Sequence, residues 1–165
     1  MIVVVADTSP LNYLIQIECQ DLLPALFERV LVPAAVVKEL DHPGTPAVVR
    51  AFLREMPQWI AVRQVRATPD PALVVLDPGE REAIQLAKEE HADLLLMDEK
   101  MGVRLARRQG LAVIGTLGIL VQAAQYGLVD INAVLARLRA TDFRSTPQLF
   151  EQARQRANEA QDGRA

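Results

Sequence analysis

The sequence predicts an α/β fold, in which helices pack around a mainly parallel β-sheet. Short apolar runs alternate with segments of helical periodicity along most of the 165 residues. Two of these runs, Ile2–Ala6 and Leu94–Met97, are continuously apolar, as buried parallel strands are. Strands that alternate with helices favour crossover connections, and hence a sandwich of helices around a parallel sheet.

The first 65 residues supply two further strands and four helices. The first strand ends at Asp7, and the residues after it favour a helix start, with Pro10 suited to the first helical position. Apolar residues at helical spacing predict helices over Leu11–Ile17, Leu22–Glu28, Ala34–Leu40 and Thr45–Glu55. The runs Val30–Val32 and Ile60–Val65 are shorter strand candidates.

The remaining elements follow a loop. Ala67–Pro78 contains three prolines and predicts a loop around a short turn. After it we expect strands at Leu94–Met97 and Ala112–Ile114, and helices at Gly79–His91, Lys100–Gln109, Leu117–Tyr126 and Ile131–Arg139. Gly110 and Gly127 follow helical patterns and predict their ends.

Residues 1–158 are expected to form a single domain, because this length buries an ordinary core. Beyond Ser145 the chain is polar, with Leu149, Phe150, Ala153 and Ala157 at helical spacing. This segment is either a last docked helix or a frayed end. Residues 159–165 are predicted to be a disordered tail.

Composition limits the classes of partner and compartment. Half of the residues are hydrophobic, 24% are charged, and the net charge is −3. The single Cys19 rules out an internal disulfide and suits a reducing, cytoplasmic compartment. The first residues read as a strand rather than a signal peptide, and no later run is long enough to cross a membrane. Because the net charge is negative, the chain would have to bind a polyanion through a local basic face or through bound cations.

Acidic residues end both continuously apolar strands. Asp7 follows Ile2–Ala6, while Asp98 and Glu99 follow Leu94–Met97. The carboxyl ends of parallel strands lie at one edge of a sheet, where α/β proteins place their sites. Either acid alone could serve as a helix cap. Two strands that end in the same way favour a shared acidic site.

Two glutamates lie on apolar helix stripes instead of opposite them. Glu39 shares a face with Ala35 and Val36, and Glu80 shares one with Ala83 and Ile84. The alternative for Glu80 is a favourable charge in the first turn of a helix. By the same helical geometry, the other glutamates of this segment are expected to face solvent, namely Glu82, Glu89 and Glu90.

Four inward carboxylates require a cation or a proton. A like pair at ~4 Å costs roughly 4 kcal/mol at an effective dielectric constant of 20. All-oxygen ligation favours Mg²⁺ or Mn²⁺ over Zn²⁺, and His42 and His91 lack metal-ligand spacing. A basic helix face follows Asp98 and is formed by Lys100, Arg104, Arg107 and Arg108. It is either a solvated face or a surface that binds phosphates.

These features together resemble the PIN-domain family of metal-dependent ribonucleases, and in particular its VapC-like members. The matching stretches are "VVVADTSPL", "VPAAVVKEL", "LDPGEREAIQLA", "LLLMDEKMGVRLA" and "GLAVIGTLGILVQAAQYGLV". The resemblance implies a three-layer α/β/α sandwich and an endoribonuclease that uses one or two Mg²⁺ or Mn²⁺ ions. It further implies an acidic quartet of Asp7, Glu39, Glu80 and Asp98, with Glu99 as an additional candidate and Ser9 in support.

The resemblance also implies partners and leaves alternatives open. RNA would be the substrate, with Lys100, Arg104, Arg107 and Arg108 on its backbone. If the chain is a toxin, a small antitoxin protein is expected, and the apolar segments Leu22–Phe27 and Leu149–Phe150 suit a homodimer. The alternative is a PIN-like module that binds RNA or protein without turnover. A phosphotransfer domain ranks lower, because Ser9 stands where a second Asp would be required.

Overall fold

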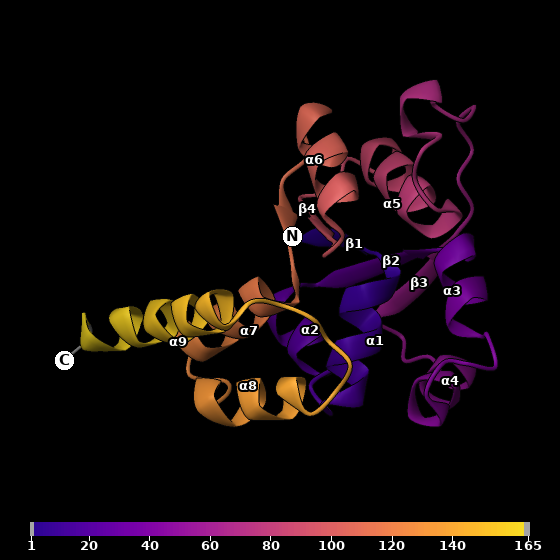
Figure 1. Ribbon diagram of the computed structural model, residues 1–165. Helices are drawn as coiled ribbons and strands as arrows, with labels where there is room; N and C mark the ends of the chain where they lie inside the picture. Colours follow the sequence, from indigo (N-terminus) through magenta and orange to yellow (C-terminus); the bar gives the residue numbers. More distant parts are fainter. Residues whose placement is uncertain (1, 164–165) are drawn as a thin grey trace.

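A computed structural model describes residues 2–163, and within them the chain forms a five-stranded, wholly parallel sheet (Figure 1). The strand order is β3-β2-β1-β4-β5. The strands are β1 (Val3–Ala6), β2 (Arg29–Pro33), β3 (Ile60–Arg63), β4 (Leu94–Leu96) and β5 (Val113–Ile114). The predicted α/β class and parallel sheet are confirmed.

Helices connect the strands and cover both faces of the sheet, which gives the predicted three-layer sandwich. Figure 1 shows α5 and α6 on one side of the sheet and α1, α2, α7 and α8 on the other. The helices are α1 (Thr8–Gln16), α2 (Leu22–Leu26), α3 (Ala34–Leu40), α4 (Ala47–Arg54), α5 (Pro78–Glu89), α6 (Lys100–Arg108), α7 (Thr116–Gln125), α8 (Ile131–Arg139) and α9 (Pro147–Asp162).

The boundaries differ from those predicted by one to three residues at most ends. Helix α1 begins at Thr8, so Pro10 lies inside its first turn and not at its first position. Strand β3 ends at Arg63, two residues before the predicted end. Gly110 and Gly127 have φ of +83° and +75°, and each follows the end of a helix, as predicted.

Two apolar cores lie on opposite faces of the sheet because strand side chains alternate. Val4, Ala6 and Leu96 point into the larger core, which α1, α7 and α8 complete. Val5 and Leu95 point into the smaller core under α5 and α6. The continuously apolar strand sequences are thus explained by burial on both faces.

The C-terminal segment is a docked helix. Helix α9 packs along α7, and Phe150, Ala153 and Ala157 are buried in the larger core. The helix continues to Asp162, and therefore runs into the segment 159–165 that was predicted to be a tail. Residues 164 and 165 lie outside the described residues.

The loop Ala67–Pro78 contains one short 3₁₀ turn, Pro71–Leu73, as predicted. Leu73 and Leu76 anchor it in the smaller core. Within the part of the chain that the structure describes, none of the helices combines the length and the apolar character needed to span a membrane.

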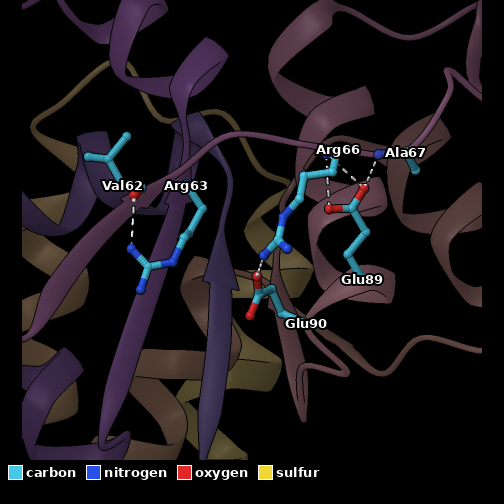
Figure 2. Close-up of polar contacts among 6 residues, drawn as sticks. All are labelled: Val62, Arg63, Arg66, Ala67, Glu89 and Glu90. Atoms are coloured by element: carbon cyan, nitrogen blue, oxygen red, sulfur yellow. Dashed lines mark hydrogen bonds and ion pairs between the residues drawn. The ribbon is translucent and has the colours of Figure 1, made fainter.

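The outer acids of α5 are not simply solvated. Glu89 accepts hydrogen bonds from the backbone N–H groups of Arg66 and Ala67, and Glu90 lies 3.7 Å from the Arg66 guanidinium (Figure 2). Glu82 Oε2 accepts from the backbone N–H of Ala35, at 2.8 Å, in the first turn of α3. All three glutamates are partly exposed but contact other segments, so the prediction that they face solvent holds only in part. Glu82 and Glu89 hold neighbouring backbone segments against α5, whereas Glu90 contacts the side chain of Arg66.

Candidate active site

The two strand-end aspartates lie side by side, at the point where the strand order of the sheet reverses. In the sheet, β1 pairs with β2 on one side and with β4 on the other. The register aligns Ala6 with Leu96, and the Asp7 N–H donates to the Leu96 carbonyl at 2.9 Å. Asp7 and Asp98 therefore emerge at the carboxyl edge of two central strands, where α/β sheets form their crevices.

Asp7 is a buried carboxylate. It occupies the N-cap position of α1, yet its side chain makes no capping hydrogen bond, and the residue is only 3% exposed. Burial raises the pKa of Asp7 from 3.8 to about 7, while the Thr8 N–H lowers it. The charges of Glu80, Glu39 and Asp98 contribute to this increase in the pKa of Asp7, after burial. Asp7 Oδ1 is buried without a hydrogen-bond partner among the described residues.

Glu39 reaches the same cleft from α3 and is held at both oxygens. The Thr8 hydroxyl donates to Oε2 at 2.7 Å, and the backbone N–H of Gly79 donates to Oε1 at 2.9 Å. A Cβ at position 79 would lie 2.6 Å from Glu39 Oε2, so glycine is what permits this approach. The carboxylate thus binds the first turns of both α1 and α5.

Asp98 is held by the start of α7. Thr116 donates to it twice, from its N–H to Oδ1 at 2.8 Å and from its hydroxyl to Oδ2 at 2.6 Å. Thr116 is fully buried, and a Cβ on Gly115 would lie 2.7 Å from Asp98 Oδ1. The side chain of Asp98 is therefore fixed in orientation before any ligand arrives.

Glu80 has both of the roles that its sequence position suggests, because it belongs to a helix cap and also faces the acidic cleft. Its Oε2 accepts from the Asp77 N–H at 3.3 Å, as part of a capping box at the start of α5. Its side chain also faces the acidic cleft. Burial raises the pKa of Glu80, and the charges of Glu99, Asp77 and Glu39 add to this, against the effect of the Asp77 N–H.

All four predicted acids line one cleft of about 550 Å³. Its described lining includes seven carboxylate side chains and a single cation, Arg144. The other acids are Asp77, Glu99 and Asp142, and Ser9 also lines the cleft. Glu99 accepts from the Gly102 N–H at 2.8 Å and so caps α6. Among the described lining residues of this cleft, acids therefore outnumber cations by seven to one.

The predicted basic face lies beside this cleft. Lys100, Arg104, Arg107 and Arg108 line a depression of about 600 Å³ along α6, together with Asp98. These four side chains are exposed. The cations of α6 thus adjoin the acid that ends β4.

Several residues of the site were missed by sequence reasoning. Thr8 and Thr116 donate to the acids, Gly79 and Gly115 make room for them, and the loop that carries Arg144 closes one side. The first strand-end motif does contain hydroxyl groups, but Thr8, and not the expected Ser9, donates to Glu39. The "GT" of "VIGTLG" was a second signal, since both residues directly follow β5.

The donor set suits a hard divalent cation. It consists of carboxylate oxygens, and it includes the unpartnered buried Oδ1 of Asp7. Among residues 2–163, however, no three His, Cys, Asp or Glu side chains are already grouped as metal ligands. Glu39 and Asp98 are each turned toward protein donors. By chemistry and charge, these carboxylate oxygens are donors of the kind that Mg²⁺ or Mn²⁺ prefers.

Comparison with known protein families identifies the family of the chain. The family model of the PIN domain, a fold of the nuclease type, matches residues 3–159. A search of curated proteins finds no match.

Proposed function

Because this chain belongs to the PIN-domain family, we propose that it is a Mg²⁺- or Mn²⁺-dependent endoribonuclease. The observation that carries the proposal is the convergence of Asp7, Glu39, Glu80 and Asp98 on one cleft. Buried carboxylates are retained where they bind a cation or move protons, since their burial otherwise destabilises the fold. The raised pKa of Asp7 reflects this unfavourable burial of its charged form.

Asp7 and Asp98 would hold the cation, with help from Glu39 and Glu80. A bound divalent cation supplies Lewis acidity and lowers the pKa of water, which suits hydrolysis of a phosphodiester to leave a 5′-phosphate. Asp7 contributes an oxygen that has no competing protein donor. The carboxylates also exclude substrate phosphate from the cleft until their charge is neutralised.

Thr8, Thr116 and the Gly79 N–H act as positioning groups. They hold Glu39 and Asp98 by four hydrogen bonds of 2.6–2.9 Å. Such bonds reduce the freedom that each carboxylate would lose on binding a cation. The cations of α6 lie outside the acids and would contact the RNA backbone.

The first test is cleavage of an unstructured, end-labelled RNA by the purified chain. We expect cleavage with millimolar Mn²⁺ or Mg²⁺, none with EDTA, and restoration when Mn²⁺ is added back. Products should carry a 5′-phosphate, which a phosphate-dependent 5′-exonuclease detects. Cleavage that persists unchanged in EDTA would contradict a metal-dependent mechanism.

A second candidate is a PIN-like module that binds RNA or protein without cleaving it. The observation in its favour is that Glu39 and Asp98 already have protein donors at both oxygens. The same assay separates the two functions, because a binding module would retain the labelled RNA intact at every Mn²⁺ concentration. A small antitoxin protein as partner remains a prediction.

A further inference from the structure

A second hollow adjoins the acidic cleft and is lined mainly by uncharged polar groups. It has a volume of about 620 Å³ and lies between α1, the turn that joins α3 to α4, and the end of α8. We call it the polar pocket, and its polar lining includes Asn12, Gln16, Glu39, His42, Thr45 and Asp142. Asn12, Glu39 and Asp142 also line the acidic cleft, so the two hollows are continuous.

The polar pocket and the cations of α6 adjoin different acids. Glu39 lies on α3, which follows β2, and Asp98 follows β4, and these two strands flank β1 on its two sides. The polar pocket meets the acids at Glu39, whereas the depression along α6 meets them at Asp98. The two hollows share none of their described lining residues. A ligand that crosses the acids from α6 therefore reaches the polar pocket beyond them.

One face of α1 leads from the acids into the polar pocket. Thr8, Asn12 and Gln16 follow one another at intervals of four residues, which places them on the same side of the helix. Thr8 donates to Glu39 at 2.7 Å, and Gln16 Nε2 donates to Asn12 Oδ1 at 2.9 Å. The second of these bonds leaves the Asn12 amide nitrogen to donate, and Gln16 Oε1 to accept, within the pocket.

The turn between α3 and α4 is held in place by its own hydrogen bonds. The Gly44 N–H donates to His42 Nδ1 at 3.0 Å, and the Thr45 N–H donates to the His42 carbonyl at 2.9 Å. Arg50, in α4, donates from Nε to the Thr45 carbonyl at 3.2 Å. Because Nδ1 of His42 accepts a hydrogen bond, the neutral ring carries its proton on Nε2 and offers it as a donor.

The charge of the polar pocket disfavours a phosphate and favours a neutral group with N–H donors. Its described lining contains the carboxylates of Glu39 and Asp142 and neither lysine nor arginine. A phosphate would therefore be repelled, whereas carboxylate and amide oxygens accept hydrogen bonds from N–H groups. Among the four RNA bases, guanine presents the most N–H donors on its Watson–Crick edge, and it has a carbonyl oxygen beside them. His42 and Asn12 can donate to that oxygen.

We propose that the polar pocket binds the base of a nucleotide next to the cleaved phosphodiester and favours guanine there. Gln16 Oε1 and the carboxylates would accept from the N–H groups of the base, and His42 Nε2 or the Asn12 amide would donate to its carbonyl oxygen. This inference rests on the proposed function and adds a sequence preference to it. Contacts between cations and phosphates cannot supply such a preference, because phosphates are the same at every nucleotide.

The test compares four nonamer RNAs of uridine that carry guanosine, adenosine, cytidine or uridine at the central position. The value of kcat/KM in Mn²⁺ is measured for cleavage at the bonds that flank this position. We expect the wild type to favour guanosine over uridine by about tenfold. Gln16→Met removes the acceptor at nearly constant shape and should lower this ratio to about twofold. Gln16→Glu, which keeps an acceptor oxygen, should retain most of the preference.

The matched control is Gln152→Met, since Gln152 is exposed on α9 and lines neither the acidic cleft nor the polar pocket. The control should keep the wild-type ratio of guanosine to uridine. Equal cleavage beside all four bases, or a preference that Gln16→Met leaves unchanged, would overturn the inference while the proposed function stands.

Binding decides the inference if the wild-type chain cleaves none of these RNAs, in which case the proposed nuclease is rejected. The same RNAs, labelled with fluorescein, are titrated in Mg²⁺ buffer with proteins that carry Asp7→Asn, and fluorescence anisotropy is recorded. Tighter binding of the guanosine RNA that Gln16→Met abolishes would support the polar pocket. Equal dissociation constants for the four RNAs would overturn it.

Discussion

Asp7→Asn is expected to reduce metal-dependent RNA cleavage by more than about a hundredfold. Substitution of a residue that only supports a metal ligand typically changes metal affinity or activity by about 10–100-fold. Asp7 would contact the cation itself, so a larger effect is expected. The substitution keeps the shape of the side chain but removes the charge that holds a cation. The measurement is the initial cleavage rate in Mn²⁺, with thermal unfolding recorded on the same preparations.

The matched control is Asp41→Asn. It makes the same chemical change at an exposed position at the end of α3, outside the acidic cleft. We expect the control to cleave at the wild-type rate. Equal rates for wild type and Asp7→Asn, in samples free of contaminating nuclease, would remove Asp7 from the active site.

The second large effect is on stability in the absence of metal. The pKa of Asp7 is about 7 in the fold, against a usual value of 3.8. The folded protein therefore binds a proton that the unfolded chain has released, between about pH 4 and pH 7. Protonated Asp7 therefore contributes to the free energy of unfolding. This contribution is fully present below about pH 4 and is lost as the pH rises through about 7.

Asp7→Asn removes this dependence. Between pH 5 and pH 8 the free energy of unfolding of the wild type should fall relative to that of the variant by about 2–3 kcal/mol. Urea denaturation in EDTA at several pH values measures the difference, and the subtraction cancels the titration of those acids that do not interact with Asp7. Parallel pH profiles for the two proteins would show that Asp7 does not titrate as its burial requires.

Much of the fold follows from local patterns. Continuous apolar strands and amphipathic helices are set by alternation and by the helical repeat, so nearly every element was found. The pairing of Asp7 with Asp98 also followed, because both end buried parallel strands. Glu39 and Glu80 were located since a charge on an apolar stripe conflicts with its surroundings.

The contacts that orient these acids could not be predicted from local sequence patterns. Thr8 meets Glu39 across 31 positions of sequence, and Thr116 meets Asp98 across 18. Such pairs depend on how helices dock, which periodicity does not specify. The same holds for Glu82, whose place on α5 predicts solvent but whose carboxylate caps the start of α3.

Some ends of helices and strands could also not be predicted from local sequence patterns. Helix α1 begins at Thr8 although Pro10 marks a favoured first position, because the turn follows directly from the strand end at Asp7. Arg144 lies in the segment between α8 and α9, which has no periodicity to interpret. Its position beside the acids depends on the packing of Phe143 against Tyr13 and Phe150.

The central claim is that the four carboxylates bind a divalent cation, and calorimetric titration with Mn²⁺ tests it most directly. Wild-type protein, freed of metal, is titrated beside Asp7→Asn at pH 8, where the carboxylate of Asp7 is charged. The claim predicts saturable Mn²⁺ binding by the wild type that the variant loses. Absence of saturable binding by the wild type, or equal binding by both proteins, would contradict it.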